Sequence, residues 1–170
     1  IGAVNVLLTR GDVDPNRRDN GGYSPLHVAV LGNHLDVVRR ILEIPDLDYL
    51  TPAFDGRTVM ESASGPIYEE LEKYDLRKTK NNPIDATGTT KLMKAIRDGN
   101  MDRFNLLLEL GANVNIQRPG DGATALILAV LHANENMVER LLSVPDIDVN
   151  IEANDSSFAL YIACERGYTD

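Results

Sequence analysis

The stretch Gly22-Tyr23-Ser24-Pro25-Leu26-His27-Val28-Ala29 contains the start of a helix and one copy of a repeat. Serine is a favoured helix N-cap, and proline suits the first helical position because its missing N–H needs no partner there. Three of its positions return at spacings of 32 to 34 residues: the turn residue (Gly22, Gly56, Gly88, Gly122, Ser156), a large apolar residue (Leu26, Met60, Leu92, Leu126, Leu160) and an alanine (Ala29, Ala63, Ala95, Ala129, Ala163). This periodicity predicts a stack of repeated units.

A second apolar segment follows three of these copies, at residues 37–42, 104–108 and 137–142. Each unit is therefore expected to hold a short helix, a longer amphipathic helix and a polar loop. Local signals agree, because Thr58 and Glu61 have the spacing of a capping box and Thr90 and Thr124 occupy the same cap position. The small alanines of the first helix favour close helix–helix approach.

These units resemble ankyrin repeats. The resemblance rests on residues 23–29, on Gly-Ala-Asn-Val-Asn at 111–115, on Pro-Asp-Ile-Asp-Val-Asn at 145–150 and on a fainter copy at 14–16. It covers nearly the whole chain. It implies an all-α solenoid of stacked helix-turn-helix units with projecting β-hairpin or loop fingers, and a concave face made of fingers and inner helices.

The phase of the repeats predicts one array over residues 1–170. We place a partial repeat at 1–20, repeats at 21–52, 53–85, 86–118 and 119–152, and a partial repeat at 153–170. The repeat at 53–85 is degenerate, because Gly65-Pro66 interrupts its first helix and no glycine-led loop follows its second. The basic residues Arg77, Lys78 and Lys80 at its end have two interpretations, a solvated helix end or a docking patch for an acidic partner. The incomplete units and the initial Ile1 lead us to expect a longer parent protein.

Composition excludes several classes of function. The chain has 17 Lys and Arg against 26 Asp and Glu, a formal net charge of −9, which disfavours nucleic-acid binding. The single Cys164 allows no intramolecular disulfide and favours a reducing, intracellular setting, cytoplasmic or nuclear. We expect Cys164 to be buried, because it follows the small residue Ala163 of a predicted helix. No apolar stretch is long enough to insert across a bilayer.

Catalytic candidates are few, and we predict that the segment is not an enzyme. Ser24 and His27 lie three residues apart, but Ser24 is needed as a helix cap and no acid is placed to orient the imidazole. The resemblance implies that His27 is a structural histidine bonding the neighbouring loop, and that His34 opens an outer helix. Neither a phosphate-binding loop nor a credible set of metal ligands is present, so we expect no cofactor and no metal.

The resemblance implies that a protein or peptide partner contacts the finger tips and inner-helix ends. In Tyr49, Leu50 and Phe54 the polar loop carries apolar and aromatic residues of the kind that anchor interfaces. Alternatively, Leu50 and Phe54 fold back onto the irregular repeat. The full set of predicted partner-binding residues is Tyr23, Leu31, Tyr49, Leu50, Phe54, Arg57, Arg97, Asp98, Ile116, Leu131 and His132.

We therefore predict a non-enzymatic scaffold for protein–protein interaction. Its acidic charge favours partners with a basic surface. One alternative is an intramolecular regulatory or targeting module of a larger enzyme or toxin, and another is a spacer whose groove residues tolerate substitution. The sequence carries no signal for oligomeric state.

Overall fold

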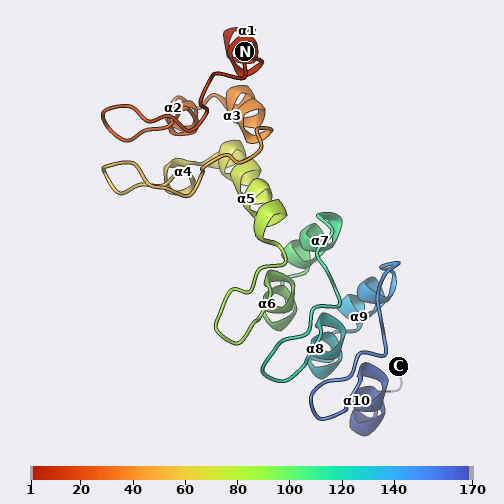
Figure 1. Cartoon of the computed structure of the whole chain (residues 1–170). Helices are drawn as coiled ribbons and strands as arrows, with labels where there is room; N and C mark the ends of the chain where they lie inside the picture. Colours follow the sequence, from red (N-terminus) through yellow and green to blue (C-terminus); the bar gives the residue numbers. More distant parts are fainter. Residues whose placement is uncertain (1, 169–170) are drawn as a thin grey trace. The chain divides into compact units, whose positions relative to one another are not determined.

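The computed structural model describes residues 2–168, which form helices joined by loops (Figure 1). The ten helices of this range are α1 (Gly2–Leu8), α2 (Pro25–Leu31), α3 (Leu35–Leu42), α4 (Val59–Ser62), α5 (Gly65–Thr79), α6 (Lys91–Arg97), α7 (Met101–Glu109), α8 (Ala125–Leu131), α9 (Glu135–Leu142) and α10 (Ala159–Arg166). Within the described residues there is no strand, only an isolated antiparallel bridge between Pro83 and Thr90. The predicted all-α class is confirmed. No helix in this range is long and apolar enough to cross a membrane.

The chain forms two compact units. The N-terminal unit ends at Asp75, and the C-terminal unit begins at Leu76. This boundary lies inside α5 and inside the segment 53–85, where the sequence departs most from the repeat pattern. The repeat boundaries themselves stay a proposal.

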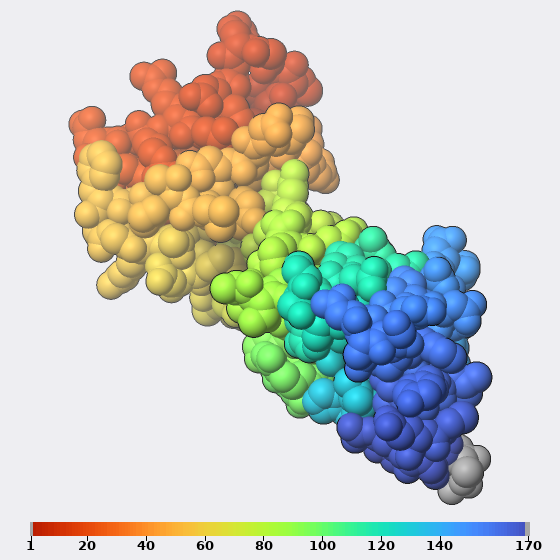
Figure 2. Space-filling view, turned by 60° about the horizontal axis from the view of Figure 1, so that its bottom comes forward, coloured from red at the N-terminus to blue at the C-terminus, as the bar shows by residue number. Residues whose placement is uncertain are grey.

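The N-terminal unit is built around α2, which packs against α3 and α4. Its core contains the fully buried side chains of Leu26, Val38, Val59 and Leu71, from α2, α3, α4 and α5 in turn. Figures 1 and 2 show α1, in red, at the edge of this unit. The Arg40 Nε on α3 donates to Asn5 Oδ1 on α1 at 2.9 Å, which ties the two helices together.

The C-terminal unit repeats the same arrangement more regularly. The inner helices α6, α8 and α10 pack in sequence, and the outer helices α7 and α9 pack against α6 and α8. Its largest fully buried side chains include Phe104 and Leu107 of α7 and Met137 and Leu141 of α9. Because α8 has helices on several sides, all its residues up to Val130 are buried.

The predicted cap residues begin the inner helices. The side chains of Ser24, Thr58, Thr90 and Thr124 each accept a hydrogen bond from the backbone N–H three residues later. The capping box of Thr58 with Glu61 is present. These bonds satisfy N–H groups that a helix leaves without an internal partner, so the caps fix where each finger ends and each inner helix begins.

The fifth copy of the repeat departs from this pattern. Phe158 stands at the cap of α10 and makes no side-chain cap bond. Leu160 is 68% exposed although its four counterparts are buried or partly buried, and Cys164 is exposed, so the expectation of a buried thiol is wrong. The physical reason is that, within residues 2–168, α10 makes its main contacts with α8 alone.

Candidate binding surface

Neighbouring fingers are joined by hydrogen bonds in both units. In the N-terminal unit the backbone N–H of Phe54 donates to the Gly21 carbonyl at 3.0 Å. In the C-terminal unit the N–H of Asn154 donates to the Asp121 carbonyl at 2.9 Å. Each finger therefore rests on the next one, and its exposed side chains are held on a fixed backbone.

Three of the predicted anchors in the N-terminal unit are large apolar side chains exposed to solvent. Phe54 is 80% exposed, Leu50 63% and Leu31 55%. The ring of Phe54 lies over Gly22, where a Cβ would come within 2.7 Å of the ring. Leu50 and Phe54 do not fold into the irregular repeat, so the alternative interpretation of these two residues is wrong.

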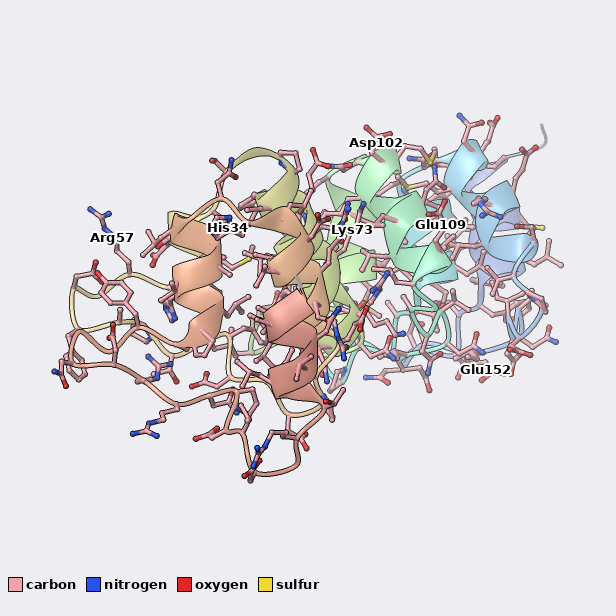
Figure 3. The ribbon with its side chains drawn as sticks, turned by 90° about the horizontal axis from the view of Figure 1, so that it is seen from above. His34, Arg57, Lys73, Asp102, Glu109 and Glu152 are labelled. Carbon is pink, nitrogen blue, oxygen red and sulfur yellow. The ribbon has the colours of Figure 1, made fainter. Side chains whose placement is uncertain are left out.

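Polar groups lie on the same finger as Phe54 and on the finger before it. Tyr23 is partly exposed, and its hydroxyl donates to Asp55 on the next finger at 2.9 Å. This hydrogen bond raises the pKa of Tyr23. Arg57 is exposed, and Figure 3 shows it at a finger, pointing away from the helices. A cation is thus available on the same finger as Phe54.

Tyr49 requires a correction, because the structure buries it. Its side chain is 7% exposed, and its ring packs edge-to-face against that of Tyr74 with 5.1 Å between the ring centroids. Its hydroxyl donates to Asp75 Oδ1 at 3.1 Å. Burial, followed by the negative charge of Asp75, raises the pKa of Tyr49 to about 12. Leu47, two residues earlier, is buried as well, whereas the next residue, Leu50, is exposed.

Four of the five residues predicted in the C-terminal unit lie at the ends of α6 and α8, and the fifth, Ile116, lies in the loop between α7 and α8. Asp98 pairs with Lys94 one turn earlier, which lowers the pKa of Asp98, and it lies 3.9 Å from Arg97. His132 is exposed, with its Nδ1 2.8 Å from the Leu128 carbonyl, and the neighbouring Leu131 is partly exposed. Ile116 is partly buried against the core.

A groove lies beside Leu131 that sequence analysis did not find. It is a cavity of about 610 Å³ bounded by α8, α10 and the two fingers that precede them. We call it the acidic groove and define it by Asp121, Ile127, Leu131, Asp155, Tyr161, Ile162, Glu165 and Arg166. The repeat phase could have predicted that Glu165 belongs to this surface, because it occupies the same position of the repeat as Leu31 and Leu131. For Tyr161 the repeat phase predicts burial, because its counterparts His27 and Ile127 are buried, but the side chain of Tyr161 is exposed.

Ser24 and His27 form a structural pair. Both side chains are buried, and Ser24 Oγ lies 2.8 Å from His27 Nδ1 as part of the cap of α2. Burial lowers the pKa of His27, and the positive charge of Arg18 lowers it further. A neutral, buried imidazole suits a role in packing. In the described part of the chain, no group of three or more His, Cys, Asp or Glu could hold a metal ion.

Helix pairs stacked side by side with fingers projecting from them define an ankyrin-repeat architecture. Models of ankyrin repeats match residues 7–63 (many copies) and residues 59–153 and 92–170 (three copies). The chain belongs to the ankyrin-repeat family, as the sequence predicts. Such repeats are general protein–protein interaction modules.

Proteins of several different kinds contain a region similar to this chain. The Nuclear factor NF-kappa-B p105 subunit of Gallus gallus is 27% identical over 91% of this chain and 16% of its own length. The B-cell lymphoma 3 protein homolog of Mus musculus is 25% identical over 95% of this chain and 37% of its own length. Glycerophosphocholine phosphodiesterase gde1 of Schizosaccharomyces pombe is 27% identical over 91% of this chain and 14% of its own length. The chain therefore spans well under half of each of these relatives.

Proposed function

We propose that the chain is a non-enzymatic scaffold that binds a protein or peptide through its fingers and inner-helix ends. The observation that carries the proposal is the exposure of Phe54, Leu50 and Leu31 in the N-terminal unit. Exposed large apolar side chains are candidates for interaction sites when a partner can cover them together.

Order in the finger strengthens the proposal. The Phe54 backbone is bonded to the Gly21 carbonyl and its ring lies against Gly22, so the finger presents the ring from an ordered backbone and little backbone ordering is lost on binding. Arg57 adds a charged group next to this apolar anchor. Together they fit a partner with an apolar pocket beside an acidic or polar rim.

The net charge of −9 supports a partner with a basic surface elsewhere, because opposite charges accelerate encounter. We place this role inside the cell, in the cytoplasm or the nucleus. The single cysteine and the similarity to the Nuclear factor NF-kappa-B p105 subunit support this setting.

The test is affinity capture from cell extract with Leu31→Ser/Phe54→Ser, compared with the unchanged chain. The matched control is Val6→Ser/Leu142→Ser, which removes exposed apolar side chains from the outer helices α1 and α9. Circular dichroism checks that all three chains fold. We expect one set of proteins to be captured by the wild type and the control and reduced at least tenfold with the first variant. Equal capture by all three would contradict the proposed surface.

A second candidate is an intramolecular regulatory or targeting module of a larger enzyme or toxin. It is supported by the similarity to glycerophosphocholine phosphodiesterase gde1, of which the matching region is a small part. A photo-crosslinker at position 54 distinguishes the two candidates. It joins separate proteins under the first candidate, and segments of one polypeptide under the second.

A further inference from the structure

We propose that the acidic groove of the C-terminal unit binds an extended peptide that presents a Lys or Arg next to an apolar side chain. The inference rests on the proposed protein-binding role and names the chemistry of one partner. It concerns a surface separate from the Phe54 finger, so the two can be tested independently.

The shape and floor of the groove suit an apolar side chain. A volume of about 610 Å³ is within the range of sites that enclose small ligands and side chains. Ile127 and Ile162 are buried and supply an apolar floor, while Leu131 is partly exposed and Tyr161 is 52% exposed. A partner that covers Leu131 and Tyr161 removes apolar surface from water, which is the main source of favourable binding energy.

Two of the three carboxylates that line the groove form no ion pair within the described part of the chain. Asp155 accepts hydrogen bonds at Oδ1 from the backbone N–H and the hydroxyl of Ser157, at 3.0 and 2.6 Å, and these bonds lower its pKa. The carboxylate is thus ionised, and no described hydrogen bond uses its Oδ2. Among the described residues, neither Asp155 nor Glu165 forms an ion pair, whereas Asp121 is paired with Arg118. A partner's ammonium or guanidinium can therefore supply the charge that Asp155 and Glu165 lack.

The surroundings reinforce the local charge. Residues 121–168 contain eight Asp and Glu, two Arg and no Lys. One of the two, Arg166, lies in the groove itself and repels a cationic partner. The summed field of the segment still attracts cations, and it accelerates their association at low salt.

A second hollow, in the N-terminal unit, carries no net charge that would select a basic or an acidic partner. It has a volume of about 620 Å³ and lies among α1, α2 and α3. Its lining includes two arginines, Arg17 and Arg18, and two aspartates, Asp14 and Asp19, so it has no excess of either charge. Charge complementarity therefore selects the acidic groove.

A Lys or Arg side chain can use both features of the groove. Its methylene stem packs on apolar surface while its charged end reaches a carboxylate. The exposed ring of Tyr161 also offers a face for a guanidinium. An apolar neighbour in the peptide then occupies the floor beside Leu131.

The test is selection of a displayed library of random hexapeptides against the whole chain. The dissociation constant of the most enriched peptide is then measured by fluorescence anisotropy with three variants. Asp155→Asn/Glu165→Gln removes both charges and keeps side-chain size and the acceptor for Ser157. Arg166→Gln removes the competing cation, and Leu31→Ser/Phe54→Ser alters only the N-terminal finger.

We expect enriched peptides to carry Lys or Arg adjacent to an apolar residue. The double amide variant should weaken binding at least tenfold, Arg166→Gln should tighten it, and Leu31→Ser/Phe54→Ser should not change it. Failure to enrich any peptide, enrichment of peptides without basic residues, or equal binding by the double amide variant would overturn the inference. Protein capture that depends on Phe54 would stand in each of those cases, so failure here is separable from failure of the proposed function.

Discussion

At the residue scale, five fingers have a residue in the left-handed region of backbone space at the same place in the repeat. Gly22, Gly56, Gly88 and Gly122 have φ between 76° and 83°, and Ser156 takes the same place with φ of 65°. A left-handed conformation costs a non-glycine residue about 1–2 kcal/mol, because its Cβ approaches the following carbonyl oxygen. Glycine therefore allows this turn without the conformational cost. Two of the glycines, Gly56 and Gly122, differ in how closely other residues approach them.

Gly122 and Gly56 separate conformational strain from steric overlap. A Cβ on Gly122 would lie 2.7 Å from the backbone nitrogen of Asn154, whereas a Cβ on Gly56 has no neighbour within 4 Å. We expect Gly56→Ala to lower the free energy of unfolding by about 1 kcal/mol and Gly122→Ala by about twice that or more. Urea unfolding followed by circular dichroism measures both. Equal losses would show that the finger at Asn154 moves aside freely.

Residue patterns predict the inside of each unit better than its surface. The caps at Ser24, Thr58, Thr90 and Thr124 follow from local chemistry, which is the same wherever a helix begins. Burial of Tyr49 depends on Tyr74 and Asp75, about 25 residues away, and no local rule reports such a contact. The acidic groove is harder still, because it is formed by two fingers and two helices that only the stack brings together.

At the scale of elements, Arg18 in one unit and Gln117 in the other each join two successive fingers. In the N-terminal unit Arg18 donates to the carbonyls of Gly22, Pro52 and Thr51 and to Asp48 Oδ2, at 2.7 to 3.1 Å. In the C-terminal unit Gln117 Nε2 donates to the carbonyls of Gly122 and Glu152 at 3.2 and 2.8 Å. A glutamine can thus bond both fingers without the charge or the extra donors of arginine.

This parallel predicts unequal effects for two substitutions of Arg18. Arg18→Ala leaves several backbone carbonyls without their donor, and we expect a loss of about 1–3 kcal/mol. Arg18→Gln should lose less than half as much, because it can copy the bonds of Gln117. Hydrogen exchange of the amides in α2 and α3 gives the local stability. If the two variants lose the same amount, the ion pair with Asp48 is what holds the finger, and the backbone bonds contribute little.

At the scale of the whole molecule, the chain has two hydrophobic cores. One contains Leu26, Val38, Val59 and Leu71, and the other contains Phe104, Leu107, Met137 and Leu141. No residue belongs to both of these clusters. In repeat proteins each repeat is stabilised by its own interactions and by those with the neighbouring repeats. A substitution in one core should therefore destabilise first the compact unit that contains this core.

A pair of substitutions tests whether the cores are energetically separate. Leu71 and Leu107 are both fully buried, and replacing either by alanine removes about 2–5 kcal/mol from the core that contains it. We expect Leu107→Ala to reduce hydrogen-exchange protection most in α6, α7, α8 and α9, and Leu71→Ala to reduce it most in α2 and α3. A uniform loss across all these helices in either variant would show that the chain opens as one cooperative unit. Separate losses would mean that the Phe54 finger and the acidic groove can each keep its structure when the other unit is destabilised, so that partners at the two surfaces need not bind cooperatively.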